Sequence, residues 1–354
     1  MTAANAVLVV MWIGMTAYAL FGGADFGAGI WDLLAGGAQR GRRQRDFIEH
    51  SLAPVWEANH VWLIFVLVVL WTAFPKGFAA VASTLYIPLT LAALGMIARG
   101  AAFAFRKSIE GPSVQRLFGA AFAFSSLVTP FFLGTIAGGV ASGRVPPGIA
   151  QGDVIKSWIN PTSLLGGVLA VCACAHLAAT FLCADAAREG DLGLCEQFRV
   201  RALGSGGASG IVALAGVPLL RSDAPQLFHG LTHRGLALIL VSGIAGIVTM
   251  GLLRGKRYVL ARLAAALAVA AVVWGWAAAQ YPYLLQPDLS ISQAAAGDQT
   301  LHALLLVLVA GSILLVPALL FMYRLFQIPL HGSEPASGAN ASTAVAGRDP
   351  RGRH

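Results

Sequence analysis

Apolar runs long enough to cross a membrane recur along nearly the whole chain, separated by short polar interruptions. A helix needs roughly 20 apolar residues to cross a hydrocarbon core of about 30 Å. Segmenting the chain on that length predicts nine transmembrane helices. Their expected spans are 6–31, 52–74, 77–105, 115–141, 161–187, 204–220, 235–253, 258–281 and 300–324.

Composition supports this segmentation. Hydrophobic residues make up 57% of the chain and charged residues only 11%, which excludes an ordinary soluble domain of this length. The predicted fold class is therefore an all-α integral membrane protein, with about nine transmembrane helices arranged as two four-helix bundles plus one extra helix.

A Gly- and Pro-rich stretch near the middle of the chain divides the helices into two groups. Asn160 before Pro161 is typical of a helix start, with Asn as the cap and Pro at the first helical position. The sequence predicts a first four-helix bundle over 1–141, an outer connection over 142–160 and a second four-helix bundle over 161–282. An outer loop with the ninth helix over 283–327 and a disordered cytoplasmic tail over 328–354 complete the expected organisation.

Basic residues predict how the chain is oriented. Under the nine-span segmentation, 19 of the 24 Lys and Arg residues lie on one side and five on the other. Cytoplasmic loops carry the excess of basic residues, so the N-terminus is expected outside and the C-terminus in the cytoplasm. This asymmetry accounts for the net charge of +8 without a nucleic-acid partner.

Three ionisable residues fall within the predicted spans at similar depth. Asp25 lies about 19 residues along the first span, roughly 28 Å from its outer end and toward the cytoplasmic face. Glu57 opens the second span from the cytoplasm, and Arg99 closes the third on the same side. Charges at membrane depth are costly, so a proton entry path is one hypothesis. A structural ion pair between Arg99 and one carboxylate is the other.

Glu57 is the stronger candidate for proton exchange, because one arginine compensates two carboxylates only partly. Its neighbours Asn59 and His60 add exchangeable groups, and Trp56 is either part of this group or an interface anchor. We expect Glu57 and Asp25 to form the proton pathway. Arg99, Trp56, Asn59 and His60 are expected to support it.

Other residues suited to metal or heme binding are explained by packing. The three membrane histidines, His60, His176 and His302, are expected at different depths, which argues against a bis-histidine heme site. The four cysteines lie on or after the fifth span, where disulfides are not expected, and are read as packing residues with no metal: Cys172, Cys174, Cys183 and Cys195. Asp185 is expected to form a solvated helix-end pair with Arg188.

Several motifs together resemble one family. Residues 22–29 read GGADFGAG and residues 53–64 read APVWEANHVWLI; Arg99, FRK at 105–107 and WINP at 158–161 follow in the same order. They resemble the second subunit of cytochrome bd-type quinol oxidases. The likeness covers the first five predicted spans and the overall number of spans.

The resemblance implies a bacterial inner-membrane heterodimer. Its first subunit would carry heme b and heme d, oxidise quinol and reduce dioxygen to water, whereas this chain would ligate no heme. The implied roles of this chain are to support that subunit and to supply part of a cytoplasmic proton path through Glu57 and Asp25, beside Arg99. Membrane lipids, a structural quinone and a small accessory subunit are further partners that the resemblance allows.

One position departs from the family pattern. Gly22 stands where many relatives have an acidic residue three positions before Asp25. Either Glu57 and Asp25 suffice or the path differs in this subgroup, and heme b alone in the partner stays open. Two alternative functions also remain: a purely structural membrane subunit, and an ion-coupled secondary transporter.

Overall fold

The helices predicted from the apolar runs are present in a computed structural model, which describes residues 2–36, 39, 41–52, 56–106 and 112–327. Side chains are described in these ranges except at 52, 56–58, 103, 106, 112–117 and 322–327. The chain forms two compact units, Met1–Leu308 and Val309–His354. Helix α14, Asp298–Gln327, contributes residues to both units.

The first span runs from Ala3 to Leu33 and changes its winding in the middle. Helix α1 (Ala3–Ala17) passes into a single π-helical segment, η1 (Tyr18–Gly22), and then into α2 (Gly23–Leu33). Such π-helical turns inside α-helices are frequent at functional sites. This one ends three residues before Asp25.

The segment predicted as one span over 77–105 is broken in the structure. Helix α4 (Trp56–Ala73) is followed by α5 (Pro75–Thr84), which turns away by 119°, and then by α6 (Tyr86–Arg106). Proline explains both breaks, because its ring clashes with the carbonyl four residues earlier and it has no N–H. Pro75 opens α5 after a non-helical Phe74, and Pro88 in the first turn of α6 prevents α5 from continuing.

The sixth span is longer than predicted. Instead of 204–220, helix α9 runs from Leu192 to Asp223, and it begins where the Asp191 carboxylate accepts the Leu194 N–H at 3.0 Å. That hydrogen bond and the Arg43 guanidinium, 2.6 Å away, lower the pKa of Asp191. Charged residues that the sequence analysis assigned to a loop therefore extend the helix, which at about 1.5 Å per residue is longer than the bilayer core is thick.

The remaining spans agree closely with expectation. The Asn160 side chain caps α8 (Pro161–Arg188) by accepting the Ser163 N–H at 2.9 Å, and Pro161 is the first residue of this helix, as predicted. The remaining elements are α3 (Arg42–Leu52), α7 (Pro112–Ala141), α10 (Pro225–His233), α11 (Leu236–Arg254), α12 (Tyr258–Gln280), β1 (Tyr283–Leu285), β2 (Leu289–Ser290) and α13 (Ile291–Ala294). Of these, the short helices α3, α10 and α13 and the β1–β2 hairpin were not predicted.

The all-α membrane fold is confirmed, but nine spans are not confirmed as such. Within the described residues, seven helices are long and apolar enough to cross a membrane, or eight if the bent pair α4 and α5 counts as one span. The apolar part of α6, Tyr86–Ala102, is shorter. Large apolar side chains such as Ile244 and Ile247 of α11 are exposed, as expected for a surface in contact with lipid or another membrane subunit. The division into two four-helix bundles stays a prediction.

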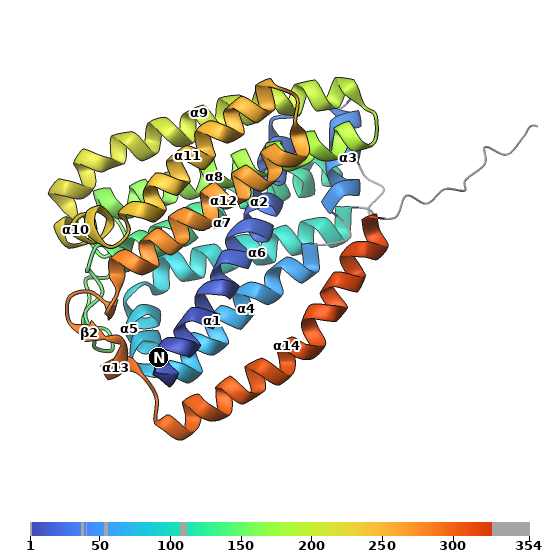
Figure 1. Ribbon diagram of the computed structural model, residues 1–354. Helices are drawn as coiled ribbons and strands as arrows, with labels where there is room; N and C mark the ends of the chain where they lie inside the picture. The colour runs from blue at the N-terminus through green and yellow to red at the C-terminus, as the bar shows by residue number, and fades with distance from the viewer. Residues whose placement is uncertain (1, 37–38, 40, 53–55, 107–111, 328–354) are drawn as a thin grey trace, which may run out of the picture. The chain divides into compact units, whose positions relative to one another are not determined.

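Within the first unit, α8 is the central helix. It packs against α2, α7, α9 and α12, and Figure 1 shows α8 and α9 running side by side. The core between α2, α8 and α9 is built from small and aromatic side chains, including Trp31, Ala178 and Phe198. Small residues allow membrane helices to approach closely.

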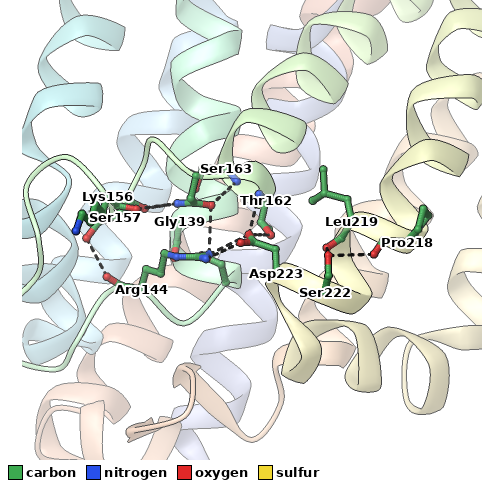
Figure 2. A network of polar contacts seen from close by, with 12 residues as sticks. Gly139, Arg144, Lys156, Ser157, Thr162, Ser163, Pro218, Leu219, Ser222 and Asp223 are labelled. Carbon is green, nitrogen blue, oxygen red and sulfur yellow. Dashed lines mark hydrogen bonds and ion pairs between the residues drawn. The ribbon is translucent and has the colours of Figure 1, made fainter.

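A polar network joins the 142–160 connection to the ends of α8 and α9 (Figure 2). Arg144 donates to both carboxylate oxygens of Asp223, at 2.7 and 3.1 Å. The same carboxylate accepts the Thr162 N–H at 3.0 Å and the Thr162 hydroxyl at 2.5 Å. Asp223 therefore holds the first turn of α8 against the last turn of α9.

Replacing Asp223 with asparagine is expected to lower stability by about 2 kcal/mol, because an amide accepts at one atom only and carries no charge to pair with Arg144. The apparent Tm of the detergent-solubilised protein measures this. Asp288→Asn is the matched control, since Asp288 is exposed and lies in the hairpin. Equal apparent Tm values for the two variants would contradict a stabilising role for the network.

Candidate functional site

Asp25 and Arg99 form an ion pair buried between helices. Arg99 Nη2 lies 2.6 Å from Asp25 Oδ1, and the two residues are 3% and 1% exposed. The same nitrogen donates to the Asp25 main-chain carbonyl at 2.9 Å. Arg99 therefore neutralises Asp25, as the ion-pair hypothesis predicts, and links α6 to α2.

A third helix completes the surroundings of the guanidinium. Arg99 Nη1 donates to the Ser126 hydroxyl of α7, and Phe122, one turn earlier, lies with its ring centroid 4.3 Å from the guanidinium carbon. The Phe26 ring is 5.3 Å away on the α2 side. Aromatic faces attract cations, so these rings stabilise the buried charge beyond the ion pair itself.

The close contact between α2 and α7 depends on Gly29. A Cβ atom at this position would lie less than 3.0 Å from both Ser126 Oγ and Arg99 Nη1. The glycine-rich run around Asp25 therefore has a geometric purpose: it lets α7 reach the guanidinium that neutralises the carboxylate.

The second carboxylate oxygen of Asp25 is not used by the ion pair. Within the described part of the chain, Asp25 Oδ2 is buried and has no hydrogen-bond partner. Tyr18, Phe26 and Cys174 form a buried cluster at this crossing. A buried acceptor without a donor is costly, and such atoms in native proteins often mark functional groups or positions of bound water.

Helix α4 brings the other predicted residues to the same region. Asn59 is 2% exposed, and the His60 ring lies 6.1 Å from the Phe26 ring, next in sequence to Asp25. The structure thus places His60 near the Asp25–Arg99 pair, whereas for Asn59 it shows burial only. The side chains of Glu57 and Trp56 lie outside the described residues, so their predicted roles stay predictions.

A second acidic residue of α2 was missed by the sequence analysis. Asp32 is 5% exposed and lies 3.8 Å from Arg45 of α3. Beside it, Gln44 donates to the Trp31 carbonyl at 2.8 Å and Trp31 Nε1 donates to the Ala175 carbonyl at 2.8 Å. Asp32 follows Asp25 by seven residues, a spacing that keeps both on one helix face and was the available signal.

Asp185 has a partner that the sequence analysis did not identify. It lies 3.5 Å from Arg188, as predicted, but 3.0 Å from Arg262 of α12. Its side chain is 18% exposed, so it is not a fully solvated helix-end pair. The Arg262 contact joins α8 to α12, a pairing between distant segments that local spacing does not reveal.

The histidine of the central helix contacts the neighbouring helix α9. His176 is 7% exposed, and its Nδ1 lies 3.0 Å from the Ala202 carbonyl of α9, so its ring lies in the contact between α8 and α9. The four cysteines are free thiols; Cys183 Sγ and Cys195 Sγ lie 3.7 Å apart in the core, which agrees with a packing role.

The fold and this site define a class: a polytopic helical membrane protein with a carboxylate and an arginine paired in the contact between its helices. Comparison with known proteins makes the class specific. The chain belongs to the family described as cytochrome bd terminal oxidase subunit II, whose model matches residues 3–326.

Individual relatives agree with this family. The chain is 31% identical to the cytochrome bd ubiquinol oxidase subunit 2 of Bacillus subtilis over 155 residues, 43% of this chain and 44% of that protein. It is 22% identical to a putative cytochrome bd menaquinol oxidase subunit II of the same organism, over 92% of this chain and 96% of the relative. The first alignment thus spans less than half of its relative, and the second nearly all.

A solved structure supports the fold over the same range. The bd oxidase from Geobacillus thermodenitrificans contains a chain that is 26% identical and superposes with a TM-score of 0.76, covering 92% of this chain and 99% of that one. The architecture described above is therefore that of a bd oxidase subunit.

Proposed function

We propose that this chain is the heme-free second subunit of a terminal quinol:oxygen oxidoreductase of the cytochrome bd type in the bacterial inner membrane. It supports a heme-bearing first subunit, which carries heme b and heme d, or heme b only, and it supplies part of the cytoplasmic proton path for reduction of dioxygen. Its N-terminus lies outside and its C-terminus in the cytoplasm, as the nineteen-to-five distribution of basic residues predicts.

The unpartnered oxygen of Asp25 is the observation that carries the proton role. Arg99 neutralises the carboxylate through Oδ1, whereas the buried Oδ2 has no donor among the described residues. A carboxylate with one open acceptor is suited to exchange hydrogen bonds with a water or a second acid. Glu57, in the first turn of α4, is the acid that we propose to exchange protons with the cytoplasm.

A purely structural role is the competing proposal, and the ion pair itself favours it for Asp25. Breaking a buried pair leaves one charge uncompensated, which is a sufficient physical reason for keeping both residues. The two proposals differ at Glu57, since only the proton-path role requires a titratable group there.

Glu57→Gln separates these proposals because glutamine keeps the size and polarity of the side chain but carries no exchangeable acid proton. We expect quinol-driven oxygen consumption to fall at least about tenfold, while heme content and yield stay at the level of the unmodified protein. Oxygen consumption with a saturating quinol in detergent, together with a heme spectrum of the same sample, measures both.

Glu189→Gln is the matched control, since Glu189 is an exposed carboxylate at the end of α8. It should leave turnover unchanged. Full turnover in Glu57→Gln would remove Glu57 from the path and leave the structural role. Purification of this chain from membranes without any heme-bearing partner would instead contradict the oxidase proposal.

A further inference from the structure

Helix α10 carries two histidines one turn apart. His229 and His233 are both exposed, and their rings are stacked with centroids 3.9 Å apart and planes at 15°. Side chains four residues apart lie on the same face of a helix. Leu227 of the same helix is buried, and α10 packs against α12, so the backbone that carries the two rings is anchored to the bundle.

Hydrogen bonding sets the tautomer of one ring. His233 Nδ1 lies 2.9 Å from the His229 carbonyl oxygen and 3.2 Å from the Thr232 hydroxyl. A carbonyl only accepts, so in the neutral ring Nδ1 carries the hydrogen and Nε2 keeps its lone pair. Histidines that bind metals through Nε2 commonly have Nδ1–H bonded to a backbone carbonyl in this way.

The spacing of the rings suits a shared ion. Two imidazole nitrogens bound to one ion at about 2.0–2.1 Å each are separated by no more than roughly 4.2 Å. The ring centroids of His229 and His233 are 3.9 Å apart. Both side chains are exposed, so rotation about their side-chain bonds can move them out of the stacked arrangement and turn both Nε2 atoms toward one ion.

We propose that His229 and His233 form a surface site for a divalent transition-metal ion of the class that prefers imidazole, such as Cu²⁺ or Zn²⁺. Water completes the coordination. Binding joins two successive turns of α10 and is independent of the Asp25–Arg99 pair.

Copper titration of the full-length chain tests the site. The chain is purified from membranes with the subunits that accompany it, using an affinity tag without histidine, at a pH above the ordinary range of histidine. Calorimetry is expected to show one bound Cu²⁺ per chain, and its electron paramagnetic resonance spectrum should show two nitrogen ligands. This two-nitrogen signal should disappear in His229→Ala and in His233→Ala. The affinity of either variant for Cu²⁺ should fall at least about tenfold, because the remaining histidine has no second histidine on the same helix to share the ion.

His302→Ala is the matched control. His302 is also exposed, and its Nδ1 lies 2.7 Å from the Asp298 carbonyl, but no second histidine lies one turn away. It should retain the two-nitrogen equivalent. Gel filtration checks folding, and glutamine variants replace any alanine variant that misfolds. Unchanged copper binding in the His229 and His233 variants, or an equal loss in His302→Ala, would overturn the proposal.

Discussion

Arg99→Met is expected to destabilise the protein by about 3–5 kcal/mol, the usual cost of leaving one member of a buried ion pair without its partner. Arg99 provides the cation 2.6 Å from Asp25 Oδ1 and also bonds Ser126 of α7. Methionine replaces the apolar part of the side chain but neither contact. Since native proteins are stable by only about 5–15 kcal/mol, the amount of folded chain recovered from membranes should drop sharply.

The double variant Asp25→Asn with Arg99→Met distinguishes the charge effect from lost packing. Removing both charges takes away the uncompensated carboxylate, so most of the lost stability should return. Arg99→Lys should lie between, because an ammonium lacks the fork that reaches both Asp25 and Ser126. Apparent Tm and recovered yield measure the series. A stable Arg99→Met variant would show that Asp25 is not held by this pair.

Gly27→Ala is the second large effect that we expect. A Cβ atom at Gly27 would lie less than 3.0 Å from the backbone carbonyl carbon and oxygen of Cys174 and from Ala178 Cβ. Backbone atoms of α8 cannot move aside as the end of a flexible side chain can, so α2 and α8 must separate. Overpacking of this kind costs about 1–3 kcal/mol for alanine, and a larger side chain should prevent assembly.

Gly243→Ala is the matched control for this substitution. Gly243 lies within α11, and a Cβ atom there would meet nothing within 4 Å. Alanine has the higher helix propensity, so stability should stay level or rise slightly. If Gly27→Ala and Gly243→Ala have the same apparent Tm, the close approach of α2 and α8 does not require glycine. Separation of α2 from α8 would also displace Asp25, so turnover is a second measurement for the variant.

Sequence alone determined the class of protein and most of the helices. Long apolar runs can satisfy their backbone polar groups in a bilayer only as helices, so the approximate limits of most helices follow from the hydropathy along the chain. The sequence also predicted the start of α8 correctly, with Asn160 as the cap and Pro161 as the first helical residue. Asp25 and Arg99 were recognisable because charge inside an apolar run is rare.

Only the tertiary structure showed that Arg99 pairs with Asp25, because the two residues are 74 positions apart in the chain and lie on different helices. The same holds for Ser126 and for Arg262 beside Asp185. The breaks around α5 and the extension of α9 also escaped the apolar pattern, since a turned helix and a continued helix have similar hydropathy. Spacing along one helix is periodic and readable, whereas contacts between helices depend on how they pack.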